Sequence, residues 1–194
     1  MQKKKPFEEL HDRIQKTANN RFNAHNRLKL HHSLSLWTIT LLSIGLILVP
    51  LLETFDLDSG LRSGYSAFVQ TFFAIVILVI SIILNMTNFS VRAERFHQCG
   101  LILNALARRV HQKIDENAGG IEYEKYVQDY DNALQRFDNH SRIDYLYTKS
   151  HMTNYYKNPW WFYGYTRIRR FSEYVFYLLI IIFEGILIWP LVAL

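Results

Sequence analysis

Three apolar blocks constrain this chain more than any other feature of its sequence. They are Leu34–Leu52, Ala67–Met86 and Tyr174–Leu194. Each is about 20 residues long, and a helix of that length crosses a hydrocarbon layer of about 30 Å. The blocks predict an all-α integral membrane protein. A short turn joins the first two blocks into a transmembrane helical hairpin, and a long polar stretch separates that hairpin from the third apolar helix.

The distribution of charge predicts the orientation of the hairpin. The turn after the first block is acidic, with Glu53, Asp56 and Asp58 against Arg62. The segment before that block is strongly basic and contains Lys3, Lys4, Lys5, Arg13, Lys16, Arg21, Arg27 and Lys29. By the positive-inside rule the N-terminus is cytoplasmic. We therefore expect a multi-pass membrane protein whose N-terminus lies in the cytoplasm.

Basic and aromatic residues mark the predicted cytoplasmic ends of the membrane helices. The expected membrane-interface residues are Arg92, Arg95, Trp160, Trp161, Arg167, Arg169 and Arg170. The formal net charge of +5 could also suit nucleic acid. Because the basic residues gather beside membrane ends, anionic lipid is the favoured partner, and direct nucleic-acid binding is not expected.

Apolar residues at helical spacing predict a small cytosolic helical bundle. One stripe begins at Phe7 and continues into the first span. A second runs through Cys99, Ile102 or Leu103, Leu106 and Val110 in a helix that Ser90 can cap, a third runs from Tyr123 to Phe137, and a short helix covers Ile143–Tyr147. The expected parts are a cytosolic amphipathic helix (1–32), the transmembrane hairpin (33–89), a cytosolic helical region (90–154), and an interfacial aromatic segment with the C-terminal helix (155–194).

The aromatic segment Tyr155–Tyr165 precedes the third block. Tyr and Trp rings have an apolar body and a polar edge, which favours the headgroup level of a membrane. This segment is therefore expected along the inner membrane surface. Packing of the rings against the cytosolic bundle is the alternative.

Polar residues follow one face of the second apolar block. At about 100° per residue, Gln70, Ser81, Asn85 and Asn88 share a stripe less than about 90° wide. Amide side chains facing lipid are unfavourable, so this polar stripe should face another helix or water. It predicts either a pathway lined by several copies or interhelical hydrogen bonds within one subunit.

Glu184 is the other costly residue, because an acid near the middle of a membrane helix costs about 2.5–3.5 kcal/mol. It is expected to face protein or water. It could donate to Gln70, to Ser81 or to a neighbouring protomer, line a cation route, or pair within its own subunit.

No catalytic or cofactor pattern stands out. The sequence lacks a glycine-rich phosphate loop, a His-Glu-x-x-His motif and a Cys-x-x-Cys motif, so no metal, cofactor or enzymatic activity is expected. His31-His32 is interpreted as a pair of interfacial polar residues. Cys99 lies on an apolar stripe and is interpreted as a buried structural thiol.

Several short motifs together resemble a known family. They are Arg21-Phe22-Asn23-Ala24-His25-Asn26-Arg27-Leu28, Ser35-Leu36-Trp37-Thr38-Ile39, Arg92-Ala93-Glu94-Arg95-Phe96-His97-Gln98-Cys99 and Asn139-His140-Ser141-Arg142-Ile143-Asp144-Tyr145. The chain resembles the SLATT family of two-transmembrane effector domains associated with SMODS nucleotidyltransferases and SLOG sensors, and is similar to a branch found beside reverse transcriptases. The third apolar block exceeds the two spans of that family.

The resemblance implies an antiphage or conflict-system effector. It would form a homo-oligomer in the inner membrane and permeabilise it when a partner sensor, such as a nucleotidyltransferase, SLOG or reverse-transcriptase system, detects infection. Abortive infection would be the outcome. Two alternatives are a membrane-anchored scaffold that recruits a cytosolic partner and a small ion transporter that uses Glu184.

Overall fold

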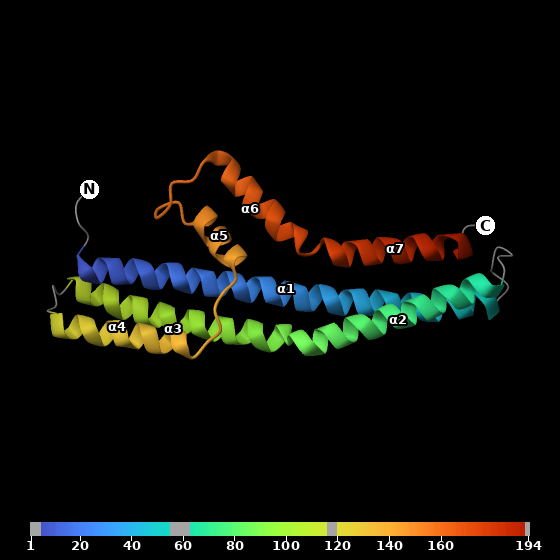
Figure 1. Ribbon diagram of the computed structural model, residues 1–194, viewed down its shortest axis with the longest axis horizontal. Helices are drawn as coiled ribbons and strands as arrows, with labels where there is room; N and C mark the ends of the chain where they lie inside the picture. The colour runs from blue at the N-terminus through green and yellow to red at the C-terminus, as the bar shows by residue number, and fades with distance from the viewer. Residues whose placement is uncertain (1–4, 55–62, 116–119, 193–194) are drawn as a thin grey trace. The chain divides into compact units, whose positions relative to one another are not determined.

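A computed structural model describes residues 5–54, 63–115 and 120–192, and over these ranges the chain forms α-helices and no strand (Figure 1). This confirms the predicted all-α class. The helices are α1 (Pro6–Thr54), α2 (Ser63–Thr87), α3 (Phe89–Asp115), α4 (Gly120–Gln135), α5 (Arg142–His151), α6 (Trp160–Ser172) and α7 (Val175–Val192). The acidic turn predicted around Asp56 and Asp58 lies outside the described residues.

Helix α1 runs for 49 residues from the amphipathic stripe into the first apolar block. Proline is tolerated in the first turn of a helix because its missing N–H has no partner there, and α1 begins at Pro6. The prediction that the N-terminal helix continues directly into the first membrane span is therefore confirmed.

Two helices are long and apolar enough to cross a membrane: the Pro6–Leu52 part of α1, and Gly64–Ile114, which joins α2 to α3. Helix α7 has 18 residues. It counts as a third candidate span only when taken with α6 across the break between them. The two spans confirm an integral membrane protein.

The α2–α3 junction differs from the prediction. Ser90 was expected to cap the helix after the second span, but α3 begins at Phe89 and Ser90 lies inside it. Asn88 has a φ of 46°, and its backbone N–H donates to Leu84 O at 3.3 Å. Asparagine tolerates this left-handed conformation better than most residues, so Asn88 is the junction residue and does not continue the α2 face.

The chain divides into two compact units: unit 1 is Met1–Lys29 with Ser90–Arg170, and unit 2 is Leu30–Phe89 with Phe171–Leu194. The aromatic segment was grouped with the C-terminal helix from the sequence, whereas residues up to Arg170 belong to unit 1. Helix α1 contributes its first half to unit 1 and its second half to unit 2.

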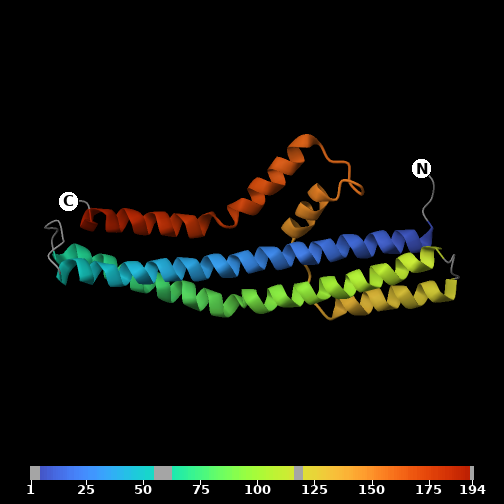
Figure 2. The ribbon, with the colours of Figure 1, turned by 180° about the vertical axis from the view of Figure 1, so that it is seen from behind.

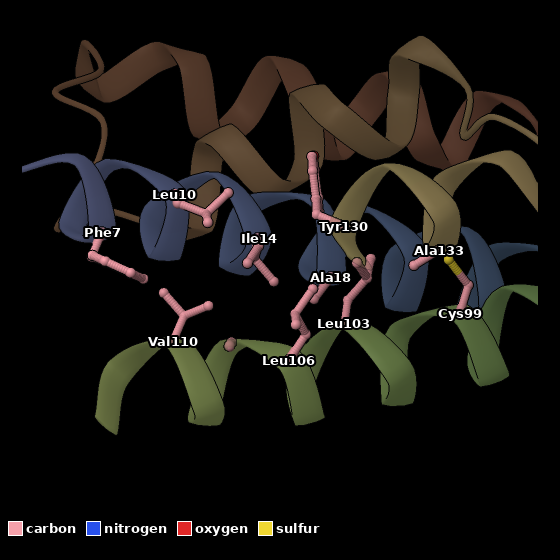
Figure 3. Close-up of a cluster of buried hydrophobic side chains, with 11 residues drawn as sticks. Phe7, Leu10, Ile14, Ala18, Cys99, Leu103, Leu106, Val110, Tyr130 and Ala133 are labelled. Carbon is pink, nitrogen blue, oxygen red and sulfur yellow. The ribbon is translucent and has the colours of Figure 1, made fainter. Parts of the chain in front are cut away.

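Unit 1 has a helical core built from the predicted stripes. The first part of α1 lies beside α3, and α4 lies beside α3 in both views (Figures 1 and 2). Ile14 and Ala18 of α1, Leu103 and Val110 of α3, and Tyr130 of α4 meet in this core (Figure 3). The structure resolves the choice between Ile102 and Leu103, because Leu103 is buried and Ile102 is exposed.

Unit 2 has a separate apolar core. Leu42 and Val49 of α1 pack with Val69, Phe73 and Ile80 of α2. Residues of α7, among them Ile180, Leu187 and Ile188, pack against this cluster, and the Tyr65 hydroxyl donates to the Leu187 carbonyl at 2.9 Å. The second half of α1, helix α2 and helix α7 therefore belong to one packed unit.

Candidate functional site

An ion pair joins α1 to the start of α5 within unit 1. Nε and Nη2 of Arg27 donate to the two carboxylate oxygens of Asp144 at 2.9 and 3.1 Å. Side-chain exposure is 13% for Arg27 and 1% for Asp144. The backbone N–H and hydroxyl of Ser141 also donate to Asp144 Oδ2, at 3.0 and 2.9 Å. One buried carboxylate therefore both caps α5 and binds α1.

Arg21 lies six residues before Arg27 on α1 and is buried. Its Nη1 donates to the carbonyl of Asp138, its Nη2 donates to Asn139 Oδ1 at 3.4 Å, and its guanidinium lies 5.6 Å from the centre of the Phe96 ring. Burial raises the pKa of the Cys99 thiol, and Arg21 opposes that rise. The expectation of a buried Cys99 is confirmed.

His140 and Asn20 extend this cluster. Asn20 Nδ2 lies 3.0 Å from His140 Nε2, within hydrogen-bond distance. Burial lowers the pKa of His140, and the positive charge of Arg21 lowers it further. Asn20 Oδ1, Arg21 Nε, His97 Nδ1 and His140 Nδ1 are buried without a hydrogen-bond partner among the described residues.

We call these residues the polar network of unit 1: Asn20, Arg21, Asn23, Arg27, His140, Asp144 and Thr148. Asn23 Nδ2 completes it by donating to Thr148 Oγ1 at 2.8 Å. Nearby, His25 Nδ1 contacts the carbonyl of Ala93 at 2.9 Å, and its ring lies 4.8 Å from that of His97. The network joins two of the four motifs that carry the family resemblance, since Arg21 and Asn139 are 118 positions apart in the sequence, and Phe96 of a third motif lies against Arg21.

The polar stripe of α2 lies outside the core of unit 2. Val69, Phe73 and Ile80 point into the core, whereas Ser81 and Asn85 are exposed and Gln70 is half-buried. The Ser81 hydroxyl donates to its own helix, at 2.7 Å from Ile77 O. Among the described residues, neither Gln70 nor Asn85 has a side-chain hydrogen bond to another helix. Asn88 is exposed at the junction, so the helical stripe consists of Gln70, Ser81 and Asn85.

Glu184 is buried between the helices of unit 2. A Cβ added to Gly45 of α1 would lie 2.5 Å from Glu184 Oε1 and 3.0 Å from Phe73, so the carboxyl group packs directly over the Gly45 backbone. Glu184 also borders two apolar pockets of about 400 and 360 Å³. Within the described residues it makes no hydrogen bond to Gln70 or Ser81, which differs from one of the sequence-based expectations.

His31 anchors a second polar contact in unit 2. The hydroxyl of Tyr177 lies 3.3 Å from His31 Nδ1 and accepts a hydrogen bond from Ser35 Oγ at 3.0 Å. Glu173 Oε2 lies 3.4 Å from His31 Nε2. These contacts tie α1 to the start of α7. The sequence pattern marked His31 as polar and interfacial but could not identify Tyr177 or Glu173 as its neighbours.

The aromatic segment divides between two environments. Tyr155 donates to Gln15 Oε1 at 2.7 Å, and Lys16 Nζ lies 5.1 and 5.2 Å from the Tyr155 and Tyr156 ring centres. Trp160 and Trp161 are exposed. Tyr155 and Tyr156 thus pack within unit 1, as in the alternative expectation, whereas Trp160 and Trp161 do not.

The basic residues expected at the membrane interface also differ among themselves. Arg92, Arg167 and Arg169 are exposed. Arg95 Nη2 donates to the carbonyl of Arg136 at 3.4 Å, and the Arg170 guanidinium lies 4.0 Å from the centre of the Tyr147 ring. Within the ranges that the structure describes, no group of three or more His, Cys, Asp or Glu side chains could hold a metal ion.

The membrane-length helices and the buried polar network together define an α-helical membrane protein in which a compact helical unit accompanies its spans. The family model of the SMODS and SLOG-associating 2TM effector domain family 5 matches residues 3–192. The chain therefore belongs to this SLATT family, whose members are membrane effectors of conflict systems. Neither the curated proteins nor the solved structures contain a match to the chain.

Proposed function

We propose that the protein permeabilises a bacterial inner membrane as a homo-oligomer, with α2 lining the opening, when a partner sensor of an antiphage system is triggered. In this proposal the N-terminus and unit 1 face the cytoplasm, as the charge distribution indicates. Abortive infection would follow from loss of the membrane barrier. The chain would act without catalysis or cofactor.

The polar stripe of α2 is the observation that carries the proposal. Gln70, Ser81 and Asn85 follow one face of a membrane-length helix, about 100° away from the face that packs into unit 2. A lone protomer in lipid would leave these side chains against hydrocarbon, where unsatisfied amides are costly. A second copy or a water-filled path would satisfy them.

Unit 1 would receive the signal in this proposal. Its polar network holds α1, which continues into the first span, to the start of α5 through the buried Arg27–Asp144 ion pair. A partner that separates Arg27 from Asp144 would release a helix that enters the membrane directly. The sensor could be a nucleotidyltransferase, SLOG or reverse-transcriptase system. The reverse-transcriptase branch is supported only by the resemblance of the motif at Asn139–Tyr145.

The experiment is a leak assay on cells that express the full chain together with its neighbouring genes. Induction by phage should admit a membrane-impermeant dye, and replacing Gln70 and Asn85 together with leucine should abolish the leak. Thr71→Val is the matched control, because Thr71 is exposed on α2 outside the stripe and donates only to its own helix, at 2.8 Å from Ala67 O.

An unchanged leak in the Gln70→Leu, Asn85→Leu variant, at normal membrane insertion, would refute the lining role of α2. A wild-type protein that binds its partner but never causes leak would instead support the membrane-anchored scaffold. If the protein is instead a small transporter that uses Glu184, the substitution Glu184→Gln should abolish transport without changing assembly. The buried position of Glu184 against Gly45 favours a packing role for this residue.

A further inference from the structure

Helix α6 presents an apolar face that no described part of the chain covers. Trp160 is 91% exposed, Trp161 is 54% exposed and Ile168 is 72% exposed. At about 100° per residue these three side chains share a sector about 100° wide. Large apolar side chains gathered on one exposed face indicate a surface that meets another phase or another molecule.

The opposite face of α6 is held within unit 1. Thr166 lies on this face and is fully buried. The Arg170 guanidinium covers the Tyr147 ring, and Lys149 Nζ lies 5.5 Å from the Phe162 ring centre. These contacts set the rotation of the helix about its axis, so the tryptophan face is directed outward.

Two exposed arginines border the apolar face. Relative to Trp160 at 0°, Arg167 lies at about −20° and Arg169 at about 180°, on the two sides of the sector that holds Ile168 and Trp161. An apolar stripe with cations along both edges is the arrangement of helices that lie in the plane of a membrane surface. The arginines would meet headgroup phosphates while the tryptophans enter the acyl boundary.

Chain connectivity gives the same answer. Helix α6 ends at Ser172 and the apolar helix α7 begins at Val175, so only Glu173 and Tyr174 separate them. Because α7 packs with the apolar parts of α1 and α2 in unit 2, a helix two residues away in the sequence should lie near the bilayer surface. The surface therefore suits a membrane better than a soluble protein partner.

We propose that α6 is an interfacial helix that binds anionic phospholipid headgroups through Arg167 and Arg169 and inserts Trp160, Trp161 and Ile168 at the acyl boundary. The attachment of unit 1 to the membrane would therefore depend on the content of anionic lipid. It does not require the oligomer or the pore, because every contact belongs to one protomer.

The test uses the full chain in nanodiscs with an environment-sensitive fluorophore on Ile168→Cys in a Cys99→Ala background. With about one third phosphatidylglycerol the label should shift to the blue and be quenched by brominated lipid. With phosphatidylcholine alone both signals should be weak. The matched position is Gln128→Cys, an exposed residue of α4, whose label should stay in water in both lipids.

The arginines supply the second arm. Replacing Arg167 and Arg169 with glutamine should reduce insertion of the label by about 30-fold in anionic nanodiscs, from the usual contribution of a basic residue near an anionic surface. Replacing Arg108 and Lys125, two exposed cations of α3 and α4, should not. A label at position 168 that remains in water, that is buried but not quenched by brominated lipid, or that inserts equally into neutral lipid would overturn the proposal.

Discussion

Asp144 of unit 1 and the amides of α2 in unit 2 differ in burial and in hydrogen bonding. In unit 1 the carboxylate of Asp144 is almost fully buried, and Arg27 and Ser141 satisfy it within the same chain. In unit 2 the amides of Gln70 and Asn85 lie outside the packed core, and no hydrogen bond to another helix satisfies them among the described residues. Asp144 of unit 1 therefore has its polar partners within the chain, whereas the α2 amides have no partner on another helix among the described residues.

Because of this contrast, substitutions in the two units should affect different properties: the stability of the fold in one case and the association of copies in the other. Buried charges tolerate no loss of a partner, because the remaining charge is desolvated. Polar residues at the rim of a membrane helix change little in a single protomer but contribute whenever copies meet. Substitutions in unit 1 should consequently act on folding, and substitutions in the α2 stripe should act on association.

The largest effect is expected for Asp144→Ala. It removes the partner of Arg27 and the cap of α5 together, and it should lower the free energy of unfolding by about 3 kcal/mol. Chemical denaturation of the purified full chain in detergent measures this change. Glu9→Gln is the control, because the Arg13–Glu9 pair is exposed and should contribute less than about 0.5 kcal/mol. Equal effects of the two substitutions would contradict a structural role for the network.

A smaller effect is expected in unit 2 for Gly45→Ala. The added methyl group would lie 2.5 Å from Glu184 Oε1 and 3.0 Å from Phe73, so the Glu184 carboxyl group has to move, at a cost of about 1 kcal/mol. The midpoint of thermal unfolding in detergent should fall. Gly185→Ala tests the interpretation, because nothing lies within 4 Å of that position. If both variants unfold alike, the close packing of Glu184 on Gly45 is wrong.

The smallest effect concerns pH. Because burial lowers the pKa of His140 from 6.5, the unfolded chain binds its proton first as the solution becomes acidic. This contribution to stability is complete above pH 6.5 and is lost as the pH falls below 6.5 toward the folded pKa. The free energy of unfolding should therefore decrease below that pH, and His140→Gln should flatten the decrease. An unchanged slope in the variant would exclude His140 as its source.

The fold was largely predictable from the sequence because apolar periodicity is a local signal. The stripes that begin at Phe7 and Cys99 and the three apolar blocks each correspond to helices in the structure. The helix start at Phe89 was not predictable, because Ser90 is a good cap in isolation and only the left-handed Asn88 moves the boundary.

The polar network was beyond sequence reasoning for a different reason. Arg27 and Asp144 are 117 positions apart, and no spacing rule connects residues on separate helices. Their motifs did indicate the family, but a resemblance does not say which side chains meet. The sequence was enough to predict that Gln70, Ser81 and Asn85 share one face of α2. It could not predict that this face is exposed, because exposure depends on how α1 and α7 pack against α2.

The mass of the full chain in nanodiscs tests the contrast between the units most directly. Native mass spectrometry should find a defined multiple of the protomer mass, and Gln70→Leu with Asn85→Leu should shift the protein toward smaller species while its unfolding in detergent stays unchanged. A wild-type protein that is monomeric at all concentrations, or a variant that assembles as the wild type does, would contradict the claim that the α2 stripe faces another copy.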